Sequence, residues 1–270
     1  MNEVTKIDGI GSSVRRTEDK KFLTGKGKYT DDINRPGQVQ AYFLRSDVAH
    51  AKIKKIDIKN AQSAPGVVGV FTGDDIAADK VGGPICGWVV PCRDGSATKE
   101  PPHPLLAQGK VRFVGDAIAV VLAETAELAK SGAELIDVDY EELSPVVDFE
   151  NAGDGAQIHD EVPNNCYFDW ELGDEKATAD ALSGAKKIVK LRVRNNRLVP
   201  NAMEPRCALA EFDNLDDSYT LHTTSQNPHL TRLVLAAFMF AIPESKLRVI
   251  APDVGGGFGS KIYVYIEEAV

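Results

Sequence analysis

The chain has 270 residues, of which 43% are hydrophobic and 26% are charged, as in an ordinary globular protein with its own core. Its 31 basic residues stand against 40 acidic ones, and the net charge of −9 argues against a nucleic-acid partner, whose phosphates require a basic face. No stretch reaches the roughly 18 apolar residues of a membrane-spanning helix, and residues 1–16 contain no signal-peptide run. We therefore expect a cytoplasmic protein without a membrane span.

Short strands separated by glycine and proline are predicted in the first part of the chain. Apolar runs predict strands at 39–44, 51–58 and 67–72, with a helical turn at 61–64. Residues 82–104 are rich in glycine and proline, which favours a long surface loop because neither residue suits a helix or a central strand.

A strand–helix–strand unit is predicted next. Residues 111–114 and 117–122 are apolar enough for strands, 124–135 have the composition and spacing of a helix, and 136–140 return as a strand. The crossover would be right-handed if the flanking strands are parallel.

A domain boundary is expected near residue 150, because 151–155 read Asn-Ala-Gly-Asp-Gly, a linker composition. This divides the chain into residues 1–150 and 151–270. The second part is predicted to contain a loop at 159–165, strands at 186–194, 207–212 and 219–224, a helix at 229–241 and a strand at 246–250.

The most informative motif is the glycine segment that follows the last predicted strand. Four of the five residues 255–259 are glycine, so backbone amides can approach a ligand without an intervening side chain. The segment fits neither nucleotide motif: Lys261 is followed by Ile262 instead of the Ser or Thr of a P-loop, and a dinucleotide fingerprint requires glycine where Ser260 stands. A nucleotide-binding protein is therefore disfavoured, and a tight structural turn remains the alternative to a ligand cradle.

Other polar residues have simpler interpretations. Glu204 and Arg206 are expected to form a local salt bridge that holds a turn. His103 is expected at the surface, and His229 is expected either to cap the start of a helix or to be solvated. The cysteines are too scattered for a zinc or redox motif and are interpreted as free thiols: Cys86, Cys92, Cys166 and Cys207.

Three polar segments together resemble the molybdenum hydroxylase family, which comprises the large subunit of bacterial carbon monoxide dehydrogenase and related domains of xanthine dehydrogenase and aldehyde oxidase. The segments are 200–206, 223–229 and 253–261. The resemblance extends over nearly the whole chain, through the motifs 9–16, 18–19, 22–25, 29–32, 113–117 and 138–143. It implies an α+β fold, with an α/β hammerhead domain followed by the first part of a mixed α/β molybdopterin-binding domain.

The resemblance also implies site residues. The family's glutamine that hydrogen-bonds to an oxygen ligand of molybdenum corresponds to Gln226, and the loop against the metal's ligands and the pterin corresponds to Gly256, Gly257, Phe258 and Gly259. Gln226 and Phe258, which would face the substrate, are the catalytic candidates, and all five residues are cofactor-binding candidates. No protein ligand to the metal is expected, because the pterin sulfurs hold it.

The implied reaction is oxidation of a small substrate, such as CO, an aldehyde or an N-heteroaromatic, with water as the oxygen source. The implied cofactor is molybdopterin with molybdenum, expected as the cytosine dinucleotide form. Electrons would pass to iron–sulfur clusters and FAD on partner subunits, since four scattered cysteines cannot hold two clusters. The expected partners are an iron–sulfur small subunit, an FAD medium subunit and the remaining part of the large subunit.

The chain departs from the family's pattern at Ile262, where xanthine enzymes carry a substrate-contacting glutamate, and this argues against xanthine as substrate. The family's general-base glutamate, and the active-site loop that carries cysteine in carbon monoxide dehydrogenases, lie in a later part of a longer chain. We therefore expect these residues to be the N-terminal portion of a large subunit, either a fragment or one half of a split subunit. The alternative is a non-catalytic binding or assembly module that keeps the fold.

Overall fold

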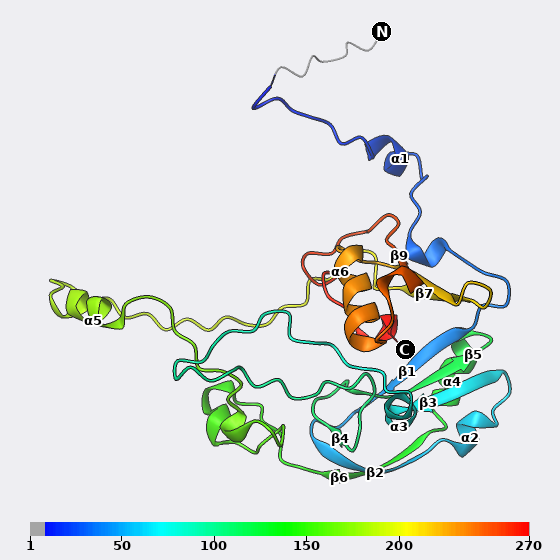
Figure 1. Cartoon of the computed structure of the whole chain (residues 1–270), viewed down its shortest axis with the longest axis horizontal. Helices are drawn as coiled ribbons and strands as arrows, with labels where there is room; N and C mark the ends of the chain where they lie inside the picture. Colours follow the sequence, from blue (N-terminus) through cyan, green and yellow to red (C-terminus); the bar gives the residue numbers. More distant parts are fainter. Residues whose placement is uncertain (1–8, 270) are drawn as a thin grey trace.

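The computed structural model describes residues 9–269 and contains three small β-sheets (Figure 1). Residues 1–8, on which the signal-peptide interpretation partly depends, lie outside the described residues. None of the helices within residues 9–269 has both the length and the apolar character needed to span a membrane. The mixture of helices and three sheets confirms the predicted α+β class.

The first sheet has the order β1-β5-β3 and is antiparallel throughout. Its strands are β1 (Gln40–Arg45), β5 (Ala117–Ala123) and β3 (Val67–Thr72), which confirms three predicted strands. The central strand β5 reads Ala-Ile-Ala-Val-Val-Leu-Ala and is almost entirely buried. A continuous apolar run is therefore explained by burial on both faces of the sheet.

The second sheet has the order β4-β2-β6, also antiparallel. It consists of β4 (Lys110–Val111), β2 (Ala51–Asp57) and β6 (Asp137–Glu142). The predicted helix is confirmed as α4 (Ala126–Ala133), with the Thr125 side chain accepting a hydrogen bond from the Leu128 amide at its N-cap.

Helix α4 connects strands of different sheets, so the condition for a parallel right-handed crossover is not met. One detail of this region was predicted wrongly. The strand predicted at 111–114 ends at Val111, because the chain turns at Gly115, whose φ is +96°, and Phe113 and Val114 are exposed. Phe113 and Val114 therefore lie on the surface and are not part of a sheet.

The third sheet carries the second part of the fold. Strand β8 (Ser218–Thr223) pairs antiparallel with β7 (Ala208–Asp213) and parallel with β9 (Leu247–Ile250), in the order β7-β8-β9. The predicted helix at 229–241 is an α-helix, α6 (Pro228–Leu233), that continues as a π-helical turn, η4 (Val234–Met239). The apolar side of α6 and η4 packs with Leu221 and Leu247 of the sheet, which forms the main core cluster here.

The remaining elements are short and were mostly not predicted. They are α1 (Asp19–Leu23), η1 (Thr30–Asp32), α2 (Lys59–Gln62), α3 (Gly73–Ala78), η2 (Phe149–Asp154), η3 (Pro163–Asn165), α5 (Glu175–Ser183), η5 (Glu244–Lys246) and η6 (Ile266–Glu268). Helix α2 occupies the place of the predicted helical turn, and the loop at 82–104 is confirmed.

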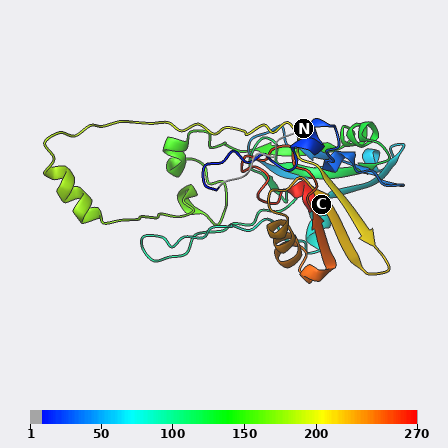
Figure 2. The ribbon, with the colours of Figure 1, turned by 90° about the horizontal axis from the view of Figure 1, so that it is seen from above.

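The strand predicted at 186–194 is absent from the described structure. Its residues are extended, exposed and paired with no other strand. Helix α5 and the segment that follows it project away from the sheets, as both views show (Figures 1 and 2). A period-2 pattern predicts a strand only where a neighbouring strand satisfies its backbone groups, and residues 9–269 provide none here.

Candidate functional site

Gln226 lies between the end of β8 and the start of α6, in a turn that side-chain hydrogen bonds stabilise. The Asn227 side chain caps α6 by accepting from the Leu230 amide at 3.2 Å, and the Ser225 hydroxyl accepts from the Asn227 amide at 3.0 Å. Ser225 also bonds to the Thr231 hydroxyl at 3.1 Å. A polar Thr-Ser-Gln-Asn-Pro sequence is suited to this position because its side chains satisfy the free amides of a helix start.

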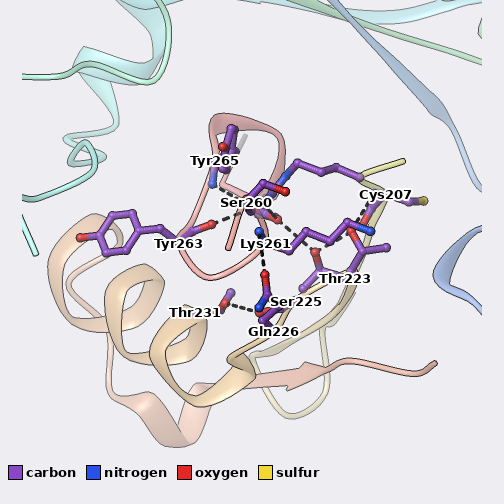
Figure 3. A network of polar contacts seen from close by, with 12 residues as sticks. Cys207, Thr223, Ser225, Gln226, Thr231, Ser260, Lys261, Tyr263 and Tyr265 are labelled. Carbon is purple, nitrogen blue, oxygen red and sulfur yellow. Dashed lines mark hydrogen bonds and ion pairs between the residues drawn. The ribbon is translucent and has the colours of Figure 1, made fainter. Parts of the chain in front are cut away.

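The side chain of Gln226 is anchored to the glycine segment. Its Oε1 accepts from the Gly259 amide at 2.9 Å and from the Lys261 amide at 3.3 Å, and its own backbone amide donates to the Lys261 carbonyl at 2.7 Å. Figure 3 shows Gln226 facing Lys261 across this contact. Because both neighbours are donors, the oxygen must face them and the Nε2 group must point elsewhere.

The glycine segment can lie against Gln226 only because position 257 has no side chain. A Cβ at Gly257 would come within 2.3 Å of Gln226 Oε1 and within 2.6 Å of its Cγ. Gly256 and Gly259 have φ angles of +101° and +90°, in the left-handed region. Phe258 adopts φ +51° between them, and its side chain is 75% exposed. The segment is therefore a tight turn that presents Phe258 outward.

This arrangement leaves hydrogen-bond donors free. Within residues 9–269, the backbone amides of Gly256, Gly257 and Phe258 and the Nε2 group of Gln226 have no hydrogen-bond partner. Gln226 is exposed, whereas Gly257 is buried beneath it. Successive free amides beside a neutral amide donor can bind oxygen atoms that carry partial negative charge.

The expected salt bridge between Glu204 and Arg206 is not formed, since each side chain has another partner. Glu204 accepts from the Gly255 amide at 2.7 Å and pairs with Lys261 at 3.2 Å, and Lys261 also donates to the Glu204 carbonyl at 2.7 Å. The Lys261 side chain is 2% exposed. The turn at 204 is thus fastened to the base of the glycine segment by a buried ion pair.

Arg206 pairs instead with Glu268, near the end of the described chain. Glu268 is buried and also accepts from the Thr223 hydroxyl at 3.1 Å, and Arg206 stacks on Tyr265 with its guanidinium carbon 3.8 Å from the ring centre. Burial raises the pKa of Glu268, while the Tyr265 amide and Arg206 act to lower it. The hydrogen bonds from Arg206, Thr223 and the Tyr265 amide compensate in part for the burial of this carboxyl.

All four cysteines are free thiols. We expect Cys207 to react more slowly than the exposed Cys86 and Cys166. Burial and the nearby Asp31 raise the pKa of the Cys207 thiol from 9.0 to about 11, whereas Cys86 and Cys166 are exposed. At a given pH well below 9, this rise in the pKa of Cys207 implies roughly 100-fold less thiolate than an ordinary cysteine would have. The thiolate is the form that reacts with the alkylating reagent. Alkylation with iodoacetamide at pH 8, followed by mass spectrometry, should label Cys86 and Cys166 well before Cys207. Labelling of Cys207 at the same rate would contradict this prediction.

The contact between Gly257 and Gln226 gives a prediction about stability. Gly257→Ala should force the flexible Gln226 side chain aside and break the bonds that Oε1 accepts, which lowers the free energy of unfolding by about 1–2 kcal/mol. Gln226→Ala should cost a similar amount. The double variant should cost no more than Gln226→Ala alone, because the added methyl group then has room. Additive losses in denaturant titrations would contradict a shared contact.

The structure brings all five sequence-predicted site residues together in one turn and its neighbour. His103 is exposed, as expected, and His229 is exposed too, which agrees with the solvated alternative. Both lie outside this turn. Sequence reasoning missed Lys261 and Glu268 as buried charges. The only available signal was the position of Lys261 two residues after Gly259, a spacing that also argues against a P-loop because Ile262 follows.

Two protein-family models match consecutive parts of this chain. The model for the a/b hammerhead domain of aldehyde oxidase and xanthine dehydrogenase matches residues 24–144. The model for the molybdopterin cofactor-binding domain matches residues 158–270, which include the candidate site.

Curated relatives are similar over nearly all of this chain. The carbon monoxide dehydrogenase large chain of Afipia carboxidovorans is 34% identical over 96% of this chain, and the nicotine 6-hydroxylase large subunit of Paenarthrobacter nicotinovorans is 35% identical over 96%. The match covers 32% and 31% of these two relatives. The chain therefore spans about a third of the length of the relatives that it matches.

Solved structures agree with the sequence comparison. Quinoline 2-oxidoreductase from Pseudomonas putida 86 superposes with a TM-score of 0.81 at 35% identity, over 95% of this chain and 32% of that one. The Cu,Mo-CO dehydrogenase gives a TM-score of 0.80 at 33% identity, over 96% of this chain and 33% of that one.

Proposed function

Because the chain belongs to the family of molybdenum hydroxylase large subunits, matching their N-terminal portion, we propose that it forms one wall of a molybdopterin site in such an oxidoreductase. The observation that carries the proposal is the orientation of Gln226. Its oxygen is occupied by the amides of Gly259 and Lys261, so its NH₂ group is left as a donor beside the free amides of the glycine segment.

These residues fit a cofactor rich in oxygen and carrying negative charge. Gln226, Gly256, Gly257, Phe258 and Gly259 would hold it through neutral donors, and Gln226 would bind an oxygen ligand of the metal. Donors that are fixed before the ligand arrives stabilise developing negative charge without reorganisation. Phe258, exposed at the tip of the turn, would border the substrate and exclude water. When bound, the cofactor supplies the oxygen-transfer and redox chemistry.

The wider assignment rests on the family. Residues 1–150 would form the N-terminal segment and hammerhead domain, and residues 151–270 would begin the cofactor-binding domain. We propose the cytosine dinucleotide form of molybdopterin, and iron–sulfur and FAD subunits that receive the electrons while the rest of the large subunit completes the site. The substrate would be CO, an aldehyde or an N-heteroaromatic, oxidised with water as the oxygen source in the cytoplasm.

The proposal is tested by counting molybdenum in the complex purified from its native source through this chain. We expect about one molybdenum per copy, together with iron and flavin on the co-purifying subunits. A folded sample that retains its native partners but contains no molybdenum would exclude the catalytic assignment. The chain would then be a non-catalytic binding or assembly module.

A further inference from the structure

The segment 186–194 has the sequence of a β-strand but no strand beside it. Val189, Leu191 and Val193 alternate with Lys190, Arg192 and Arg194, so an extended chain places apolar groups on one face and cations on the other. Three of these side chains are largely exposed apolar groups: Val189 at 79%, Leu191 at 84% and Val193 at 74%. A face of this kind is rarely left in water.

The backbone of the segment is also unsatisfied. Within the described part of the chain, no amide or carbonyl of residues 186–194 takes part in a backbone hydrogen bond. The segment meets the rest of the structure mainly through charges, since Arg192 and Arg194 both reach Glu150. Figure 2 shows it as an extended length of chain between α5 and the sheets. An extended, unpaired strand is a template for strand addition.

The charge on the segment indicates what can pair with it. Residues 186–197 contain six cations and no acidic residue, although the chain as a whole carries a net charge of −9. Directly opposed residues of paired strands interact, and like charges across a pair are destabilising. A second copy of this segment would place cations opposite cations whenever the apolar faces are matched. The partner strand must therefore alternate apolar residues with acidic or neutral ones.

We propose that residues 186–194 form a β-strand only in the assembled enzyme, by pairing with an alternating apolar and acidic strand from the rest of the large subunit. The length of the relatives supports this partner, because about two-thirds of their sequence lies outside the part that this chain matches. The inference rests on the proposed function in that its partner is the remaining large-subunit sequence. It adds the place of contact and the chemistry of the partner strand.

Hydrogen exchange with mass spectrometry tests the pairing. The amides of 187–194 should exchange on the order of 100-fold more slowly in the complex purified through this chain than in the chain expressed alone, since paired strand amides exchange only when the sheet opens. Equal exchange in the two samples, or purification of this chain without any large-subunit partner, would overturn the inference. Protection in a homodimer would replace it with self-pairing.

Substitutions at two exposed leucines test whether the partner binds the segment 186–194 or exposed apolar residues in general. Leu191→Asp should lower the amount of co-purifying large-subunit partner at least about tenfold, because it places an acid on the apolar face. Leu215→Asp is the matched control: Leu215 is 95% exposed in the turn between β7 and β8, and its replacement should leave the partner's recovery unchanged. Circular dichroism of both variants alone should match the parent, and equal recovery of the partner by both would overturn the inference.

The outcome is distinguishable from failure of the proposed function. Molybdenum with unprotected amides at 187–194 would contradict only the strand pairing. Protected amides in a complex without molybdenum would contradict the catalytic assignment and leave the pairing in place.

Discussion

Replacing Lys261 with methionine is expected to lower the free energy of unfolding by about 3–5 kcal/mol, the usual cost of removing one partner from a buried ion pair. The Lys261 side chain is 2% exposed and that of Glu204 is 10% exposed. Without Lys261, the Glu204 carboxylate keeps only the Gly255 amide, because its Oε1 is already buried without a partner. Chemical denaturation of the purified parent and variant measures the loss.

Two controls make this prediction specific to the buried charge. Lys246→Met removes a surface pair with Asp217 and should cost less than about 1 kcal/mol. Adding Glu204→Gln to Lys261→Met removes the unpaired charge and should recover a large part of the loss. If Lys261→Met costs no more than Lys246→Met, the ion pair does not hold the glycine segment.

The second large effect is expected from Gln226→Glu. The carboxylate keeps an oxygen for the amides of Gly259 and Lys261, so the free energy of unfolding should stay within about 0.5 kcal/mol of the parent. It replaces the free NH₂ donor with an acceptor, which repels an oxygen ligand. Loss of one fixed donor typically lowers turnover on the order of 10²–10³-fold. Turnover is measured on the assembled enzyme with the substrate that a screen of CO, aldehydes and N-heteroaromatics identifies.

Measuring molybdenum content as well as turnover distinguishes two roles for Gln226. Normal metal with reduced turnover would assign Gln226 to the reaction, and reduced metal would assign it to cofactor binding. A variant that is fully active would contradict both roles for the Gln226 amide. Phe258→Ala is a useful comparison, because it removes only the exposed ring and keeps the backbone amide of residue 258, so molybdenum content should be unchanged.

Local pattern was sufficient for much of the fold. The apolar run of β5, the helix α4 between its cap and its end, and the strands β7 and β8 around a polar turn were all predictable from periodicity and turn residues. Helix α5 was missed although Asp174 caps it, since none of its residues is buried and its pattern is weak. The strand predicted at 186–194 finds no partner strand within residues 9–269.

For the candidate site, the sequence by itself determined which residues matter: a glycine segment after a strand, a glutamine at a helix start, and the family that combines them. Only the tertiary structure decided how these residues meet. It joined Glu204 to Lys261 and Arg206 to Glu268, in place of the local pair that sequence proximity suggested. The physical reason is that burial of a charge and the direction of an amide depend on which distant segments pack together, and neighbours along the chain do not carry that information.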